Sequence, residues 1–164
     1  MLHLTVLDKG EKEILLRELS AVFHLNMAVF LEGGDSEQAQ NHWIREVSDA
    51  LTKENRQILL CAAGQTLAGF LMYYVRGDMV MIEEIQIRDE YRFSGVFSGL
   101  CKFLAASLPG NIGTIEAYAH KGNRRSIDIM GKLGMTPVPK EDASPFVHMQ
   151  GKIDASPTLS RIIK

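Results

Sequence analysis

The residues best placed to do chemistry lie between an apolar segment, 81–87, and an amphipathic segment that begins at Gly95. Arg88, Asp89 and Glu90 form a charged break between the two, and the apolar residues after Gly95 recur at the spacing of one helix face. A strand that turns at a glycine into a helix directs several free backbone N–H groups, and the positive end of the helix dipole, at one point. The pattern therefore indicates a phosphate-binding turn, for which an ordinary turn glycine is the alternative.

Two carboxylates interrupt the same apolar segment. Neighbouring strand residues point to opposite faces, so Glu84 shares its face with Gln86 and not with Glu83. Burial raises the pKa of a carboxyl group, which suits a base that works near neutral pH. Glu84 is therefore a candidate general base, with equal weight given to a carboxylate that is ion-paired or at the sheet edge.

A later apolar segment carries three polar residues on one face, namely Glu116, Tyr118 and His120. His120 lies at the end of this segment, where the sites of open α/β sheets gather. His120 is thus a candidate base and Tyr118 a candidate acid, although a loop histidine and an ordinary sheet tyrosine are the simpler interpretations. Cys101 follows the spacing of a helix core, and no histidine near it in the sequence would activate a nucleophilic thiol.

The elements that must position these residues follow from periodicity and turn signals. Strands are expected over 2–7, 58–63, 67–76, 79–87, 112–120 and 146–153. Helices are expected to begin after a capping box at Asp8 and Glu11, at Asp35-Ser36, at Gly95 and at Asn123. Glycine-containing two-residue turns predict antiparallel hairpins, and the strand–helix units that follow add parallel character. The expected fold class is α/β, with a mixed, partly antiparallel central sheet flanked by helices on both faces.

Composition bounds the class of protein. The 164 residues suffice for one domain with a core, and a net charge of −2 gives no support for a nucleic-acid surface. Cys61 and Cys101 lie in separate apolar segments, as buried thiols of a reducing compartment do, and the five histidines show no metal spacing. There is no signal-peptide pattern and no apolar run of membrane-spanning length. We therefore expect a cytoplasmic protein without metal, membrane or nucleic-acid partners.

Two motifs, taken with the element order, resemble the GNAT superfamily of acyl-CoA-dependent N-acyltransferases over nearly the whole chain. The main family fingerprint, [Arg/Gln]-x-x-Gly-x-[Gly/Ala] between the fourth strand and third helix, here reads Arg92-Phe93-Ser94-Gly95-Val96-Phe97. The next helix begins Asn123-Arg124-Arg125-Ser126 and ends Lys132-Leu133-Gly134-Met135, which is also similar to the family. There are two departures: Phe97 replaces a small residue, and Met130 stands near the point where many members carry a tyrosine that acts as general acid.

The resemblance implies an N-acetyltransferase that moves an acetyl group from acetyl-CoA to a primary amine of a small molecule or peptide. The pyrophosphate would lie on the backbone N–H groups of 93–97, with charge added by Arg92, and the pantetheine arm would pair with Ile85, Gln86 and Ile87. Asn123 and Ser126 would also face the cofactor, with a plain helix N-cap as the alternative for Asn123. The resemblance allows a homodimer, but no stretch of the sequence identifies an interface.

The same resemblance divides the expected single domain, 1–164, by role. Residues 1–54 would shape the acceptor site, 58–108 would supply the central strands and phosphate-binding turn, 112–153 the fifth strand, last helix and terminal strand, and 154–164 a tail. An alternative function is a non-catalytic GNAT-fold protein that binds acyl-CoA as a sensor or structural partner. A different nucleotide-binding α/β domain ranks low, because both the dinucleotide-binding glycine fingerprint and a P-loop lysine pattern are absent. The sequence names neither the acceptor nor the acyl length.

Overall fold

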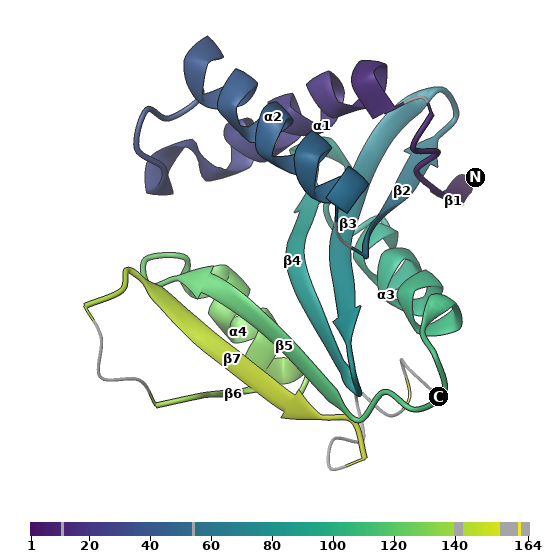
Figure 1. Cartoon of the computed structure of the whole chain (residues 1–164), viewed down its shortest axis with the longest axis vertical. Coiled ribbons are helices and arrows are strands. Elements are labelled where there is room, and N and C mark those ends of the chain that lie inside the picture. Colours follow the sequence, from purple (N-terminus) through teal and green to yellow (C-terminus); the bar gives the residue numbers. More distant parts are fainter. Residues whose placement is uncertain (11, 54, 140–142, 155–160, 162–164) are drawn as a thin grey trace. The chain divides into compact units, whose positions relative to one another are not determined.

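The computed structural model of the chain describes residues 1–10, 12–53, 55–139, 143–154 and 161 (Figure 1). Its elements are β1 (Leu2–Val6), α1 (Lys12–Met27), η1 (Ala28–Phe30), α2 (Glu37–Lys53), β2 (Arg56–Ala63), β3 (Thr66–Arg76), β4 (Met79–Ile87), η2 (Asp89–Tyr91), α3 (Val96–Ser107), β5 (Thr114–His120), α4 (Arg124–Lys132), β6 (Thr136–Pro137) and β7 (Phe146–Lys152). Each predicted strand is confirmed, with ends within two residues of those expected, whereas β6 and the 3₁₀ turns η1 and η2 were not predicted. Glu11 of the expected capping box and most of the tail 154–164 lie outside the described residues.

The strands form a seven-stranded sheet in the order β1-β2-β3-β4-β5-β7-β6. β1 is antiparallel to β2, β4 is parallel to β5, and β7 is antiparallel to both β5 and β6. The hairpin glycines Gly64 and Gly77 have φ values of 65° and 63°, as the first central residue of a type II′ turn requires. This is the mixed, partly antiparallel α/β sheet that the sequence predicts.

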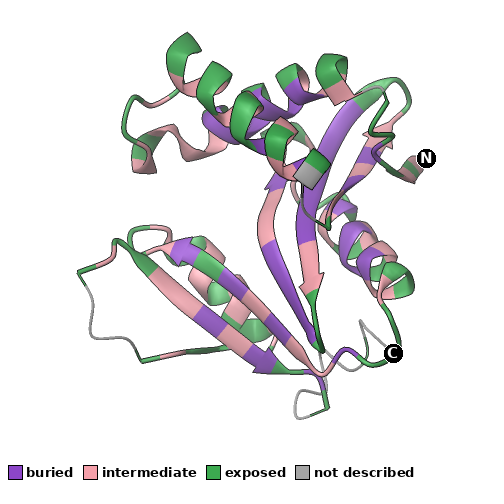
Figure 2. Cartoon of the chain, viewed as in Figure 1, coloured by how far each residue is buried: buried purple, intermediate pink, exposed green. Residues whose placement is uncertain are grey.

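The residues group into two compact units, which are described separately: Met1–Met72 with Glu84–Leu100, and Tyr73–Glu83 with Cys101–Lys164. The division of one domain by role, as expected from the sequence, stays a prediction. In the first unit α1 and α2 pack with β2 and β3 around an apolar core, and Figure 2 shows β3 buried over most of its length. Trp43 of α2 lies in this core, stacked on Phe23 with ring centroids 5.4 Å apart and edge-on to Phe70 at 6.3 Å.

In the second unit, β5 and β7 pair along their full length, and α4 runs along one side of them (Figure 1). Asn123 caps α4, because its Oδ1 accepts the backbone N–H of Ser126 at 3.2 Å. At the other end Met135 N–H donates to Met130 O at 3.0 Å and Gly134 N–H donates to Gly131 O at 2.9 Å. These two bonds, with Gly134 at φ 88°, form a Schellman motif, so the predicted N-cap and glycine stop are both confirmed.

Candidate functional site

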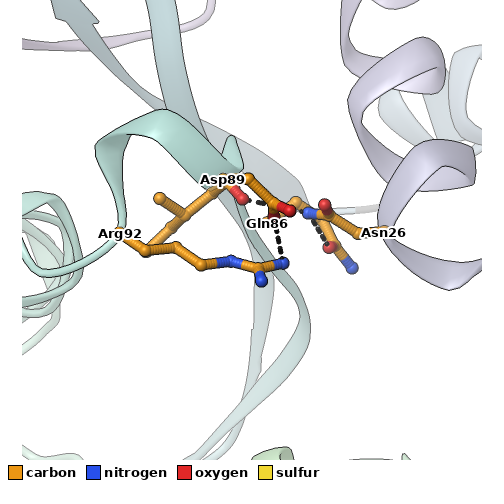
Figure 3. A network of polar contacts seen from close by, with 5 residues as sticks. Asn26, Gln86, Asp89 and Arg92 are labelled. Atoms are coloured by element: carbon orange, nitrogen blue, oxygen red, sulfur yellow. Dashed lines mark hydrogen bonds and ion pairs between the residues drawn. The ribbon is translucent and has the colours of Figure 1, made fainter.

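The turn between β4 and α3 is held by short-range polar contacts (Figure 3). Tyr91 N–H donates to Arg88 O at 2.9 Å, and Arg92 N–H donates to Asp89 O at 3.1 Å, which closes η2. The Arg92 guanidinium also forms an ion pair with the Asp89 carboxylate. Ser94 Oγ donates to Tyr91 O at 2.6 Å, so the hydroxyl braces the turn. The predicted cofactor-side charge of Arg92 is therefore present on the turn but already paired with an acid.

Two residues of this turn adopt left-handed backbone conformations. Phe93 has φ 66° and a side chain that is 98% exposed, and Gly95 has φ 88°. Phe93 is the one non-glycine residue with positive φ among the described residues, a conformation that bulky side chains rarely adopt. A Cβ added to Gly95 would meet nothing within 4 Å. The left-handed φ at position 95 therefore favours glycine over residues with a side chain, and the space beside Gly95 is open.

α3 begins directly after this open space. Gly99 N–H makes a helical bond to Gly95 O at 2.8 Å, so the N–H groups of Val96, Phe97 and Ser98 belong to the first turn, which has no acceptor within the helix. Val96 is buried and Phe97 is half-buried. Because the Phe97 side chain does not come within 4 Å of a Cβ at Gly95, it leaves the space next to the glycine clear. The arrangement can therefore receive an anion on backbone N–H groups.

A polar row on β4 faces α1 in the first unit. Asn26 Nδ2 donates to Gln86 Oε1 at 3.0 Å and to Ile87 O at 3.1 Å (Figure 3). Gln86 Nε2 in turn donates to Glu84 Oε2 at 2.8 Å. Gln86 is 6% exposed, which is unusual for an amide side chain and is explained by these bonds. The contact between Glu84 and Gln86 agrees with the shared face predicted from the sequence. Asn26 was missed, because nothing in α1 marks it as a partner of a strand 60 residues away.

The row continues to Arg88, the residue directly after β4. Arg88 Nη2 contacts Glu18 Oε1 at 3.0 Å, which gives α1 a second polar link to the strand. Arg88 Nε is buried and makes no hydrogen bond, the one such side-chain atom found among the described residues. Glu84, Gln86 and Arg88 alternate along the chain at a strand period of two, and this regular spacing of polar residues is the signal that could have predicted the row.

The β3–β4 hairpin has one more residue on its β4 side, between the turn and Arg88, than on its β3 side between Ala68 and the turn. A two-residue turn joins Arg76 of β3 to Met79 of β4. At the other end of the hairpin, Arg88 N–H donates to Ala68 O at 3.0 Å. Arg76 lies eight positions after Ala68, whereas Arg88 lies nine positions after Met79. The extra residue of β4 is the mark of a β-bulge, which leaves one residue outside the regular hydrogen-bond ladder.

In the second unit, side chains from β5 and β7 meet on one face of their pairing. Glu116 Oε2 lies 2.9 Å from His148 Nε2, and Glu116 Oε1 accepts from Gln150 Nε2 at 2.8 Å. The ring of Tyr118 stacks on His148, with centroids 4.6 Å apart and planes at 12°. The register that sets Glu116 opposite Gln150 and Tyr118 opposite His148 brings them together. His148 and Gln150 were missed, although they alternate on β7 as Glu116 and Tyr118 do on β5.

The predicted residues at the end of β5 have local structural roles. His120 Nδ1 accepts the Gly122 N–H at 3.0 Å, and its ring packs edge-on against Phe146 at 5.7 Å. A neutral imidazole that accepts at Nδ1 carries its proton on Nε2. In this tautomer His120 Nε2 is a hydrogen-bond donor and not a proton acceptor. Asn123 and Ser126 are engaged with each other in the N-cap of α4.

The two cysteines are the remaining candidates for chemistry, and both are buried. Cys61 and Cys101 are both free and buried, as predicted. Burial raises the pKa of Cys101 to about 12, so this thiol stays protonated and is a poor nucleophile at neutral pH. Among the described residues, no three histidine, cysteine or acidic side chains gather closely enough to hold a metal ion. No helix in the described part of the chain is long and apolar enough to cross a membrane.

Comparisons with known proteins place this fold. No protein-family model matches the sequence, and no curated protein matches it. Among solved structures, the PaiA N-acetyltransferase of Thermoplasma acidophilum in complex with coenzyme A is 17% identical, with a TM-score of 0.69 over 93% of this chain and 99% of that one. A GNAT-family acetyltransferase of Staphylococcus aureus is 13% identical, with a TM-score of 0.69 and the same coverage. The ribosomal-protein-S18-alanine N-acetyltransferase of Escherichia coli is 15% identical, with a TM-score of 0.64 over 93% of this chain and 94% of that one. The chain therefore has the fold of the GNAT acetyltransferases.

Proposed function

We propose that this protein is an N-acetyltransferase that transfers the acetyl group of acetyl-CoA to a primary amine. The observation that carries the proposal is the turn from Arg92 to Val96. There the left-handed Gly95 leaves open space directly before the first turn of α3, on a fold shared with acetyltransferases. One protein of that fold was solved with coenzyme A. A helix N-terminus with a bare glycine suits a pyrophosphate, because it offers several N–H donors at close range.

The cofactor contacts follow from this placement. The backbone N–H groups from Phe93 to Phe97 bind the pyrophosphate, that of Ser94 once it leaves Tyr91 O, to which it donates at 3.3 Å. Arg92 adds charge when it exchanges Asp89 for a phosphate oxygen. The backbone of Ile85, Gln86 and Ile87 pairs with the pantetheine arm, in the manner of an added strand. The β-bulge of β4 supports this role, since a residue outside the regular ladder has backbone groups to offer a thioester carbonyl.

The reaction requires an uncharged amine and two proton transfers. The uncharged nitrogen forms a bond to the thioester carbon, Glu84 accepts the proton that this nitrogen loses, and the carbon–sulfur bond breaks. The departing thiolate takes a proton from Tyr118 or from water. We assign Glu84 as the base in preference to His120, because His120 Nδ1 already accepts the Gly122 N–H and Nε2 then carries a proton. His120 is retained as a hydrogen-bond donor beside Tyr118.

The acceptor is proposed to bind against residues 1–54, with Glu32 and Asp35 attracting the cationic form of the amine.

A protein that binds acyl-CoA without turnover is the second candidate function. It is favoured by the pairing of Arg92 with Asp89, and by Met130, which offers no proton and instead contributes its carbonyl to the cap of α4. Turnover of acetyl-CoA with an amine distinguishes the two: acetylation of any amine at a rate above the uncatalysed reaction excludes the second.

Thermal unfolding with and without acetyl-CoA tests the first step. A ligand at about 100 times its Kd stabilises the native state by about 2.7 kcal/mol, which for a chain of this size raises Tm by about 5–10 °C. Gly95→Val should abolish this rise, because its side chain occupies the open space. Gly64→Val is the matched control, since Gly64 also has positive φ (65°) and nothing within 4 Å of its Cβ position, but lies in the β2–β3 turn.

The control separates strain from binding. Both valine variants carry a left-handed β-branched residue and should lose similar intrinsic stability. We expect the Gly64 variant to keep the wild-type shift with acetyl-CoA and the Gly95 variant to lose it. Equal shifts in both variants would mean that the pyrophosphate does not bind at this turn. No shift in the wild-type protein with acetyl-CoA, longer acyl-CoAs or free CoA would reject CoA binding as a whole.

A further inference from the structure

The amide pair Asn26 and Gln86 has a single consistent orientation, which follows from one unambiguous acceptor. Ile87 O is a backbone carbonyl and can only accept, so the group of Asn26 that lies 3.1 Å from it must be the NH₂ nitrogen. The same nitrogen lies 3.0 Å from the Gln86 side chain, which must therefore present its oxygen. The nitrogen of Gln86 is then directed at Glu84 Oε2, at 2.8 Å. Each donor in this row is thus fixed by the one before it.

We infer that Asn26 and Gln86 are positioning residues for the carboxylate of Glu84, which α1 holds in one orientation through the two amides. The inference rests on the proposed function in treating Glu84 as the base. Gln86 is 6% exposed and lies between the two partners on α1 and β4, so the row has no room to reorganise without losing a buried hydrogen bond. The bond donated by Gln86 favours the ionised form of Glu84, which is the form that accepts a proton.

Asn26, the α1 member of the row, lies in the last turn of α1. That helix ends at Met27, and the 3₁₀ turn η1 (Ala28–Phe30) follows. A second polar link joins α1 to the same strand end, because Glu18 of α1 pairs with Arg88, the residue after β4, at 3.0 Å. Asn26 acts on Glu84 through Gln86, because Asn26 Nδ2 donates to Gln86 Oε1 and Gln86 Nε2 donates to Glu84 Oε2. A substitution at Asn26 therefore tests the relay and not the base itself.

Two isosteric changes break the row at different links. Gln86→Glu keeps an oxygen for Asn26 but replaces the donor to Glu84 with an acceptor, so two carboxylates must share a proton. Asn26→Asp removes both donors of Asn26, and Gln86 is then drawn to donate to the new carboxylate and to turn its oxygen toward Glu84. Both variants should raise the titration midpoint of Glu84, by about one pH unit or more for Gln86→Glu.

The experiment is a carboxyl ¹³C NMR titration of Glu84, assigned by the resonance lost in Glu84→Gln, together with kcat and KM for acetyl-CoA. We expect the raised midpoint in both row variants, a lower kcat because the Glu84 carboxylate is no longer held in one orientation, and a KM within about twofold of wild type. Val22→Ala is the control for stability, because Val22 is buried on α1 one turn before Asn26 and lies outside the row. It should lower Tm and leave the midpoint unchanged.

The outcomes separate the inference from the proposed function. If the midpoint of Glu84 stays at its wild-type value in both row variants, the two amides do not control the carboxylate and the inference is wrong. A midpoint that moves equally in Val22→Ala would reduce the row to general packing, which also rejects it. A protein that shows the shifts but neither binds nor turns over acetyl-CoA would retain the positioned carboxylate and lose the acetyltransferase proposal.

Discussion

Replacing Gly69 by alanine tests how closely β3 approaches β4 beside the candidate site. An ideal Cβ on Gly69 would lie 2.6 Å from Gln86 O, 3.1 Å from Val96 Cγ1 and 3.2 Å from Ile87 Cγ1. Carbon–oxygen contacts between strands settle at about 3.3–3.6 Å, so relief requires a shift of about 0.7 Å. The nearest atom belongs to the backbone and cannot rotate away, so β4 itself must move.

The magnitude follows from two opposing terms. Overpacking in a buried site destabilises by about 1–3 kcal/mol, and alanine offsets part of this because it loses about 0.5–1 kcal/mol less conformational entropy than glycine. We expect Gly69→Ala to lower the unfolding free energy by about 1–2 kcal/mol, seen as a fall in Tm of about 2–8 °C. Acetyl-CoA binding should weaken as well, because the displaced carbonyl belongs to the segment proposed to pair with pantetheine.

Gly99→Ala is the matched control for this prediction. Gly99 lies inside α3, and its Cβ would meet Leu4 Cδ1 at 3.6 Å, an ordinary contact. Alanine is favoured over glycine in a helix interior by up to about 1 kcal/mol, so this variant should be more stable than wild type. A Gly69→Ala protein as stable as Gly99→Ala, by thermal or urea unfolding, would refute the reasoning about the strand contact.

Three further predictions concern single residues. Phe93→Gly should raise stability by up to about 1 kcal/mol in urea unfolding, because it relieves the left-handed backbone and removes an exposed ring, and a loss of stability would contradict this. Glu116→Ala should lower stability by about 1–3 kcal/mol, because His148 and Gln150 each lose a half-buried partner, and an unchanged Tm would show that the pair is not formed. Burial raises the pKa of Cys101 to about 12, so the folded state keeps a proton that the unfolded state releases above about pH 8.5. The free energy of unfolding should therefore fall by about 1.4 kcal/mol per pH unit from about pH 8.5 toward pH 12. Cys101→Val should show a shallower fall over the same pH range.

The elements of this fold were predictable from the sequence because their signals are local. The alternating strands, the helix spacing after Gly95 and the caps at Asn123 and Gly134 each depend on residues within a few positions of one another. β6 was not predicted, since two residues with a proline are too short to show a period. Its pairing with β7 is set by tertiary packing and not by its own sequence.

The candidate site was predictable only where it is continuous in the chain. Residues Arg92 to Phe97 are consecutive, so their turn could be predicted directly from the sequence. Asn26 and His148, in contrast, bind Gln86 and Glu116, which are 60 and 32 residues away from them in the chain. Strand register decides such partners, and a shift by one residue would turn every side chain to the other face. The left-handed backbone of Phe93 could not be foreseen either, because nothing in its neighbourhood demands it.

The two motifs that carry the family resemblance differ in how far folding alone explains them. Asn123 and Gly134 perform an N-cap and a Schellman stop, so α4 would favour these residues with or without a ligand. The turn before α3 has no such account: Phe93 is strained and exposed, and Gly95 borders empty space. Natural sequences break local rules mainly where function requires it. The turn is therefore the stronger functional evidence of the two, and Gly95 is the residue at which acetyl-CoA binding should first be tested.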